Sequence, residues 1–392
     1  MLEDAYIAAG ARTPMGSFLG ALAEVPATLL GSIVIAEALR RSGAPGTSVN
    51  EVVMGNVVGA GLGQNPARQA SIGAGLDVSV GATTVSRVCG SGLKAVMMAA
   101  QAIRLGEAGL VIAGGMENMT RAPYLLEKGR TGYRMGPGEI VDAMMRDGLC
   151  DAYSGSTMGA RGDATAARYG ISREEQDDYA VRSYRRALES MERGWAAAEI
   201  VAVEVPGKKG ATRVESDEEP LRFNQEKLRK LKPAFGREGT VTAGNASSIN
   251  DGAAAVTVLS KARASELRVK PVARILGYAT SSREPDWFTI APIDVNRKLL
   301  GDLSLDPKDV DVFEVNEAFA VVPLLLQREL SIPDEKLNPL GGAIALGHPI
   351  GASGARTLVT LLNALRIRKG RIGIVSLCVG GGEAVAMAVE MC

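Results

Sequence analysis

The chain has one histidine and four cysteines in 392 residues. Cys89, Cys150, Cys378 and Cys392 lie far apart, and none belongs to a CxxC pair. This spacing argues against a disulfide framework and against a structural zinc site, so we expect free thiols in a reducing cytoplasm and no metal. Because imidazole is the side chain that titrates near neutral pH, any histidine base must be His348.

The chain also lacks net charge and long apolar runs. Lys plus Arg and Asp plus Glu both number 44, so no overall field recruits nucleic acid or an anionic membrane. Charged residues or glycines break every apolar run before the roughly 20 residues that span a bilayer. Residues 1–10 lack the basic and apolar stretches of a signal peptide. We therefore expect a soluble, cytoplasmic protein without nucleic-acid or membrane partners.

The length exceeds the roughly 250–300 residues that one hydrophobic core usually supports, so at least two core-forming units are expected. Apolar residues make up 46% of the chain, which argues against disorder. Short β-branched runs alternate with glycine-rich turns and helical stretches, a pattern typical of an α/β fold. The expected strands are residues 51–58, 110–113, 310–315 and 372–377. Ligand sites should lie beyond their carboxyl ends.

A weak internal repeat indicates two similarly built halves. Ser91-Gly92 begins a helical stretch and a strand that runs into Gly114-Gly115, and Ser353-Gly354 begins a similar series that ends at Gly380-Gly381. A helix-turn-strand pattern of this kind also recurs by chance in α/β proteins. We predict a first half at residues 1–119 plus about 243–268, and a second half at residues 269–392.

Residues 120–242 differ from both halves, because they contain more Arg, Glu, Lys and Gly and fewer strand-like runs. We interpret them as an inserted, mostly helical and loop region. Within it, Ser172 and Glu175 have the spacing of a capping box that opens an amphipathic helix toward Arg193.

Cys89 is the first candidate for chemistry. It precedes a strong helical stretch, residues 93–105, which Gly106 should end. A cysteine at a helix N-terminus is favoured as the thiolate by the helix dipole and by free backbone N–H groups. The alternative interpretation is a small buried thiol, the commoner role of free cysteine.

His348 lies in residues 338–354, a segment rich in glycine that also holds two prolines. Such a segment predicts a rigid, exposed turn rather than a core helix, and it favours a functional base over a structural histidine. Asn316 follows one of the expected strands and could hold an amide or a bound water in the same site.

Cys378 directly follows another expected strand and precedes three glycines, of which Gly380 is the first. The glycines would expose backbone N–H groups able to stabilise an oxyanion, and the thiol could act as nucleophile or proton carrier. The alternative is a tight turn that contains an incidental cysteine.

Taken in order, four segments resemble the catalytic blocks of the thiolases: Cys89–Gly92, Asn316–Phe319, Gly347–Gly351 and Cys378–Gly382. Residues 242–247 and 250–255 resemble the segment of that family that contacts the pantetheine arm of coenzyme A. The resemblance covers nearly the whole chain. It implies the duplicated α/β fold of the family, with two similar halves, mixed sheets layered between helices, and an inserted helical and loop domain.

The resemblance also implies a mechanism. His348 activates Cys89, which takes an acyl group from a thioester, and Cys378 removes a proton from a second acetyl-CoA. The resulting carbanion attacks the acyl group on Cys89, and a 3-ketoacyl-CoA forms. One oxyanion hole would consist of the N–H groups of Cys89 and Gly380, and the other of His348 with water held by Asn316.

Further implied roles concern the substrate. The resemblance assigns acyl-CoA and CoA contacts to six residues: Ser247, Met158, Leu149, Phe235, Ala318 and Phe319. It implies CoA thioesters as substrates with no separate cofactor, phosphate contacts among the basic residues between Arg222 and Lys232, and a homotetramer formed through residues 123–147, with a dimer as the alternative.

The chain departs from the family pattern at two positions. Relatives that make acetoacetyl-CoA often carry histidine where this chain has Thr157, which leaves Met158 as the expected wall of the acyl pocket. Ala384 replaces a usual glycine close to the expected turn, where its methyl group should spare the N–H of Gly380.

The leading hypothesis is an acetyl-CoA C-acetyltransferase, and the nearest alternative is a broader 3-ketoacyl-CoA thiolase of fatty-acid degradation. A ketoacyl synthase is largely excluded, because it would need two histidines beside its cysteine and this chain has one. A cysteine hydrolase would leave Cys378 without a purpose. A non-catalytic acyl-CoA binding protein would not need Cys89, His348 and Cys378 together.

Overall fold

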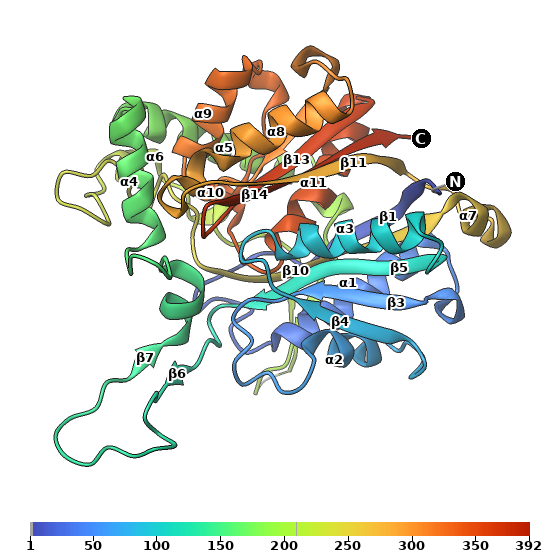
Figure 1. The fold of residues 1–392 in the computed structure, drawn as a ribbon, viewed down its shortest axis with the longest axis horizontal. Helices are drawn as coiled ribbons and strands as arrows, with labels where there is room; N and C mark the ends of the chain where they lie inside the picture. Colours follow the sequence, from blue (N-terminus) through green and yellow to red (C-terminus); the bar gives the residue numbers. More distant parts are fainter. Residues whose placement is uncertain (1–2, 209) are drawn as a thin grey trace.

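A computed structural model describes residues 3–208 and 210–392 (Figure 1). One continuous sheet runs in the order β12-β13-β14-β11-β1-β10-β5-β3-β4, with β2 paired to β10. Its strands are β1 (Ala5–Arg12), β2 (Gly16–Ser17), β3 (Glu51–Gly55), β4 (Gly81–Val85), β5 (Leu110–Asn118), β10 (Asn250–Ser260), β11 (Ala273–Ser282), β12 (Val312–Val315), β13 (Ile372–Val379) and β14 (Glu383–Met391).

The sheet order confirms the two similar halves. In the first half, β3 is parallel to β5, and β5, β10 and β1 follow as antiparallel neighbours. In the second half, β12 is parallel to β13, and β13, β14 and β11 follow in the same antiparallel manner. The halves join where β1 pairs with β11. Only β4 and the short β2 lack a counterpart within the described sheet.

Helices pack in layers on both sides of the sheet. The helices of the two halves are α1 (Ala27–Ser42), α2 (Pro66–Gly73), α3 (Ser91–Arg104), α7 (Lys261–Leu267), α8 (Ala291–Asp302), α9 (Val321–Leu330), α10 (Ala343–Leu346) and α11 (Ser353–Arg368). The central core joins Leu93 of α3 and Leu358 of α11 to Val256 and Val385 of the sheet. Helices α1 and α2 cover one outer face, and α8 and α9 cover the other.

The central helices α3 and α11 approach each other closely at their N-terminal ends. A Cβ atom on Gly354 would lie 2.3 Å from the backbone nitrogen of Leu93, and one on Gly92 would lie 2.8 Å from that of Ala355. Only glycine allows this separation, since real Cβ atoms do not approach other atoms so closely. Cys89 and His348 both precede these helix starts, so the close packing brings the two candidate residues into one region.

The expected strands all exist, although their ends differ. The strand predicted at residues 110–113 continues through Gly114 and Gly115 to Asn118. These glycines do not end the strand, because they permit close contact with neighbouring backbone: Cβ atoms there would lie 2.1 Å from the oxygens of Ala254 and Gly351.

Residues 120–242 contain α4 (Met158–Tyr169), α5 (Arg173–Glu192), α6 (Gln225–Arg229), the short strand pairs β6 (Tyr124–Leu125) with β7 (Val141–Asp142) and β8 (Val203–Val205) with β9 (Thr212–Val214), and a π-helical turn (Met144–Leu149). The capping box is confirmed, because Ser172 Oγ accepts from Glu175 N at 3.1 Å and Glu175 Oε2 accepts from Ser172 N at 2.7 Å.

The β6–β7 hairpin projects from the body as an arm, residues 123–147 (Figure 1). The boundaries of the insert stay a prediction.

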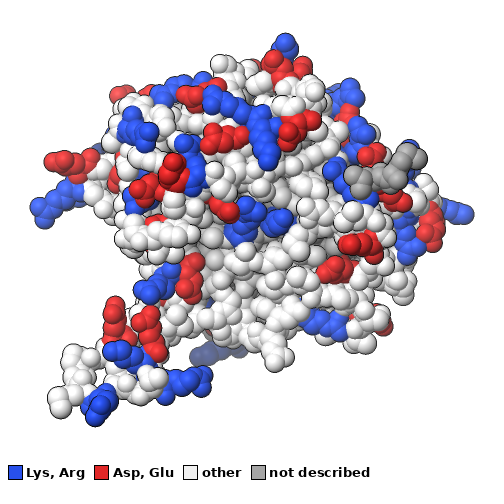
Figure 2. All heavy atoms as spheres, in the orientation of Figure 1, with Lys and Arg blue, Asp and Glu red and all other residues white. Residues whose placement is uncertain are grey.

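Acidic and basic side chains are mixed on the surface that Figure 2 shows, in agreement with their equal numbers in the sequence. The arm carries both. Among residues 3–208 and 210–392, no helix combines the length and apolarity that a membrane crossing needs.

Candidate active site

A cavity of about 480 Å³ lies where the two halves and the insert meet. Eight of the predicted site residues line it: Cys89, Leu149, Met158, Phe235, Ser247, Ala318, Phe319 and His348. They come from both halves and from the insert, so no single segment forms the cavity. The structure therefore brings together residues that are up to 259 positions apart in the sequence, the separation of Cys89 and His348.

Cys89 lies just before the start of α3, as predicted, and the turn that holds it is strained. Val88 has φ of 44°, a left-handed conformation that β-branched residues rarely adopt. Ser91 holds the turn, because its hydroxyl donates to Val88 O at 2.7 Å and accepts from Arg87 N at 2.8 Å. Strain of this kind persists only where surrounding contacts enforce it, and it is concentrated at functional sites.

The expectation that the helix N-terminus favours a Cys89 thiolate is not met in the free protein. Burial raises the pKa of the Cys89 thiol to about 11, and it outweighs the opposing effect of the Gly380 N–H, which lies within hydrogen-bonding reach of the sulfur. The protonated thiol is therefore the resting form at neutral pH, and the backbone dipoles reduce the burial penalty without overcoming it.

His348 is only 5% exposed, so the predicted exposed turn is wrong. The glycines of this segment serve close packing: a Cβ atom on Gly347 would lie 2.4 Å from the side chain of Asn250, and one on Gly351 would lie 2.6 Å from Glu117 Oε2. Asn250 Oδ1 also accepts from His348 N at 2.9 Å. The turn is thus fixed between the two halves, with its imidazole directed at the cavity.

The hydrogen bonds of His348 define its tautomer. Nδ1 lies 2.5 Å from Ser353 Oγ, and that hydroxyl donates its single proton to Pro349 O at 2.8 Å. Ser353 must therefore accept from Nδ1–H. Nε2 remains as an acceptor, 3.4 Å from the Nδ2 of Asn316. Burial lowers the pKa of His348 to about 3, and the nearby Arg356 acts in the same direction, so the ring is neutral at physiological pH.

Glu117 anchors the His348 segment and was missed by sequence reasoning. It is fully buried at the end of β5 and accepts from Gly351 N at 2.9 Å and from Val57 N at 3.0 Å. Burial raises the pKa of Glu117 to about 7, while these N–H groups oppose the shift. A buried carboxylate needs such donors. An acidic residue inside an apolar strand was the available signal.

Cys378 lies behind the cavity, fully buried at the end of β13. Burial raises the pKa of its thiol well above the ordinary range, and the neighbouring Cys89 adds to this effect. The glycine turn that follows joins β13 to β14, and Gly381 and Gly382 take φ near 90°. Ala384 lies outside this turn, within β14 and paired with Cys378, so its methyl group is part of the sheet.

Asn316 is also fully buried, and its amide nitrogen points at His348 Nε2 as described above. Its side-chain oxygen has no hydrogen-bond partner among the described residues. A buried amide oxygen without a protein partner is a natural acceptor for an ordered water.

Aromatic rings form the apolar side of the cavity. Phe319 stands edge-on to Phe235 and to Phe288, with centroid separations of 6.4 Å in both pairs. Phe288 was missed, because the chain offers no motif around it. Thr157 also lines the cavity and caps α4, with its hydroxyl 3.4 Å from Ala160 N. Met158, the first residue of α4, lies within 3.4 Å of the position that a Cβ atom on Gly380 would occupy.

Polar side chains also line the cavity. Ser247 Oγ donates to Ala318 O at 3.2 Å, which ties residues 242–247 to the segment that follows Asn316. Arg222, the first of the basic residues predicted near the CoA phosphates, lines the cavity and pairs with Glu218 at 3.4 Å. Within the described part of the chain, no cluster of three or more His, Cys, Asp or Glu side chains is arranged to hold a metal ion.

Comparisons with known proteins agree with the fold. The family description "Thiolase, N-terminal domain" matches residues 5–262, and "Thiolase, C-terminal domain" matches residues 269–391. The chain is 49% identical to acetyl-CoA acetyltransferase 2 of Arabidopsis thaliana, across 99% of this chain and 97% of that one. It is 47% identical to acetyl-CoA acetyltransferase of Cupriavidus necator, across 99% of this chain and 100% of that one.

Two solved structures have the same fold. The Acat5 thiolase of Ascaris suum in complex with coenzyme A superposes with a TM-score of 0.95 at 41% identity, covering 99% of this chain and 100% of that one. The acetyl-CoA acetyltransferase of Bacillus anthracis superposes with a TM-score of 0.97 at 39% identity, covering 100% of this chain and 99% of that one. This chain belongs to the thiolase family.

Proposed function

We propose that this chain is an acetyl-CoA acetyltransferase, which condenses two acetyl-CoA molecules to acetoacetyl-CoA and CoA and also catalyses the reverse thiolysis. One observation carries the proposal: Cys89 and His348 line one cavity, with Cys378 buried behind it and the Gly380 N–H within reach of the Cys89 sulfur. The names of the full-length relatives in A. thaliana and C. necator support the same activity.

The first half-reaction is acyl transfer to Cys89. His348 Nε2, which carries no proton, takes the thiol proton as Cys89 attacks the thioester carbonyl. The CoA thiolate then leaves with the proton of Cys378, so the imidazole keeps the proton from Cys89 and Cys378 becomes a thiolate. Since the thiol and the imidazole are both neutral at rest, charge develops only as the reaction proceeds, and the N–H groups of Cys89 and Gly380 stabilise the oxyanion.

The second half-reaction forms the carbon–carbon bond. The Cys378 thiolate removes a proton from the methyl carbon of a second acetyl-CoA, and the carbanion attacks the acyl group on Cys89. The Cys89 thiolate leaves and regains a proton. The enolate oxygen of the second thioester receives a hydrogen bond from the protonated imidazole or from water held by Asn316, whose Oδ1 is free to hold it.

A broader 3-ketoacyl-CoA thiolase is the second candidate. The cavity wall of Phe235, Phe288 and Phe319 is apolar, and Thr157 is smaller than the histidine of relatives that make acetoacetyl-CoA. A relative in Staphylococcus aureus, 48% identical over 98% of both chains, is named a probable acetyl-CoA acyltransferase.

The wider setting follows from the same proposal. CoA thioesters are the substrates, no further cofactor is needed, and the enzyme works in the cytoplasm in fatty acid metabolism.

We also propose a homotetramer formed through the arm. Exposed apolar side chains support it: the arm carries Tyr124 at 67%, Leu126 at 53%, Met135 at 96% and Ile140 at 63% exposure. Apolar side chains in such number rarely stay in water.

Thiolysis tests the function directly. Purified protein is given CoA with acetoacetyl-CoA or with a longer 3-ketoacyl-CoA, and loss of the enolate absorbance is followed. We expect cleavage of acetoacetyl-CoA that Cys89→Ala and Cys378→Ala each reduce by at least about 10³-fold. Cys392→Ala, which changes an exposed cysteine, is the matched control.

The results discriminate among the candidates. Comparable rates on both substrates would favour the broader thiolase. Absence of cleavage on both substrates would refute thiolase activity, and unchanged rates in Cys378→Ala would refute the role of that thiol.

A further inference from the structure

One wall of the cavity consists of irregular chain. Residues 230–236 contribute Phe235, and residues 240–249 contribute Ser247, yet neither segment belongs to a helix or a named strand. Such segments have no ladder of hydrogen bonds of their own, so contacts to neighbouring elements must fix their position.

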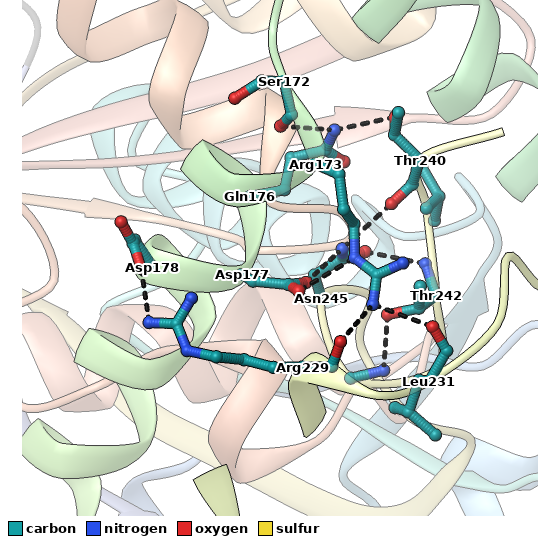
Figure 3. A network of polar contacts seen from close by, with 12 residues as sticks. Ser172, Arg173, Gln176, Asp177, Asp178, Arg229, Leu231, Thr240, Thr242 and Asn245 are labelled. Atoms are coloured by element: carbon teal, nitrogen blue, oxygen red, sulfur yellow. Dashed lines mark hydrogen bonds and ion pairs between the residues drawn. The ribbon is translucent and has the colours of Figure 1, made fainter. Parts of the chain in front are cut away.

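The first turns of α5 supply these contacts (Figure 3). Asp177 is 3% exposed, and its two carboxylate oxygens have different partners: Asn245 Nδ2 donates to one at 2.9 Å and Arg173 Nε to the other at 2.8 Å. Arg173 also donates to Leu231 O at 2.9 Å. Asp177 therefore contacts residues 240–249 directly, through Asn245, and residues 230–236 indirectly, through Arg173.

Asn245 links Asp177 to the chain segment that lines the cavity. It is fully buried, its Oδ1 accepts from Thr242 N at 2.8 Å, and its Nδ2 also donates to Thr240 O at 3.1 Å. Its backbone oxygen accepts from Ala320 N at 2.9 Å. Asn245 stands two residues before Ser247, so its side chain sets the course of the chain that enters the cavity.

We propose that Asp177 is a positioning residue for CoA thioesters: through Asn245 it fixes the wall that carries Ser247 and Phe235. The inference rests on the proposed function, because it takes the ligand of this wall to be a CoA thioester. Asp177 does not line the cavity and acts only through its neighbours.

Asp177→Asn is the informative substitution. The amide has the shape of the carboxylate, but it offers one acceptor oxygen where two are needed, and its NH₂ group would face a donor from Asn245 or Arg173. One buried contact must therefore be lost. Loss of a charge-assisted hydrogen bond on this scale corresponds to about a tenfold weaker interaction.

Asp178→Asn is the matched control. Asp178 is the next residue of α5, its side chain is 56% exposed, and it pairs with Arg229 Nη2 at 2.5 Å. Both substitutions remove one carboxylate from the same helix turn. Only the change at residue 177 disturbs the cavity wall.

Three measurements form the test: the affinity for CoA by calorimetry, kcat and KM for CoA in thiolysis, and the rate at which iodoacetamide alkylates Cys89. For Asp177→Asn we expect about a tenfold rise in the Kd and KM for CoA, a kcat at saturating CoA within about twofold of wild type, and unchanged alkylation. Asp178→Asn should match wild type in all three.

Wild-type affinity for CoA in Asp177→Asn would overturn the inference, and so would slowed alkylation with a reduced kcat, which indicates general disorder. If Asp177→Asn does not fold, Asn245→Ala takes its place with the same readouts, because it leaves the Asp177–Arg173 pair intact. A wild type that binds CoA without thiolysis would refute the proposed function alone, and one that binds no CoA would refute both.

Discussion

Single residues decide the protonation of the site. Ser353 lies five positions after His348, and its hydroxyl can accept from Nδ1–H because its own proton is used by Pro349 O. The same serine begins α11, so the tautomer of the base is tied to the start of a central helix. Both nitrogens of the ring thus have defined partners, and the one that lacks a proton faces the cavity.

Removal of the Ser353 hydroxyl should impair the base and leave substrate affinity intact. Ser353→Ala leaves a buried Nδ1–H without an acceptor, and a loss of this kind corresponds to about a tenfold fall in kcat. Steady-state thiolysis would measure it, with the KM for CoA unchanged. Ser71→Ala is the control, since Ser71 is equally buried but its hydroxyl has no hydrogen-bond partner among the residues that the structure describes. An unchanged kcat in Ser353→Ala would contradict this assignment of the tautomer.

At the scale of elements, the central helices α3 and α11 bring Cys89 and His348 together. Cys89 precedes α3 by two residues and His348 precedes α11 by five. The helices touch where Gly92 and Gly354 leave space. The separation of the two helix starts therefore controls how Cys89, the proposed nucleophile, lies relative to His348, its proposed base.

A methyl group at this contact should damage stability and activity together. Gly354→Ala places a Cβ atom 2.3 Å from the backbone nitrogen of Leu93, and overpacking of this kind costs about 1–3 kcal/mol. We expect a lower melting temperature and slower thiolysis. Gly301→Ala in α8 is the matched control, because its Cβ atom would meet nothing within 4 Å. Equal melting temperatures for the two variants would show that the helices can separate freely.

At the scale of the whole molecule, only the base of the arm is part of the folded body: Ala143 and Met144 pack with Val58, Met119 and Ile350. The rest projects as a hairpin in Figure 1, and Met135, which lies between β6 and β7 in the sequence, is highly exposed. The sheet and its helices bury their own apolar faces without it. Contact between copies of this chain is the role that we propose for it.

A charge on the arm should shift the assembly to smaller species. Met135→Glu places a carboxylate in the proposed contact, where desolvation of a charge is costly. Light scattering coupled to size exclusion should report a tetramer for wild type and a dimer or monomer for the variant. Leu105→Glu, at an apolar position of 64% exposure beside the C-terminus of α3, should leave the mass unchanged. A monomeric wild type would refute the tetramer.

The sequence by itself determined the elements and the choice of candidate reactive residues. Local signals were sufficient for this: β-branched runs predicted the strands, the Ser172 capping box predicted the start of α5, and the only histidine had to be His348. The ordered motifs indicated the family, which the comparisons confirm. Each of these inferences depends on residues that are neighbours in the chain.

The tertiary structure alone decided the environment of those residues. The predicted exposed turn is buried, and the predicted thiolate is a thiol, because desolvation depends on what packs against a group and not on its neighbours in sequence. Glu117, Phe288 and Asp177 contact residues at long sequence separations, and no local pattern identifies those partners. Only the packed chain shows which distant side chains meet, and burial then sets their charge.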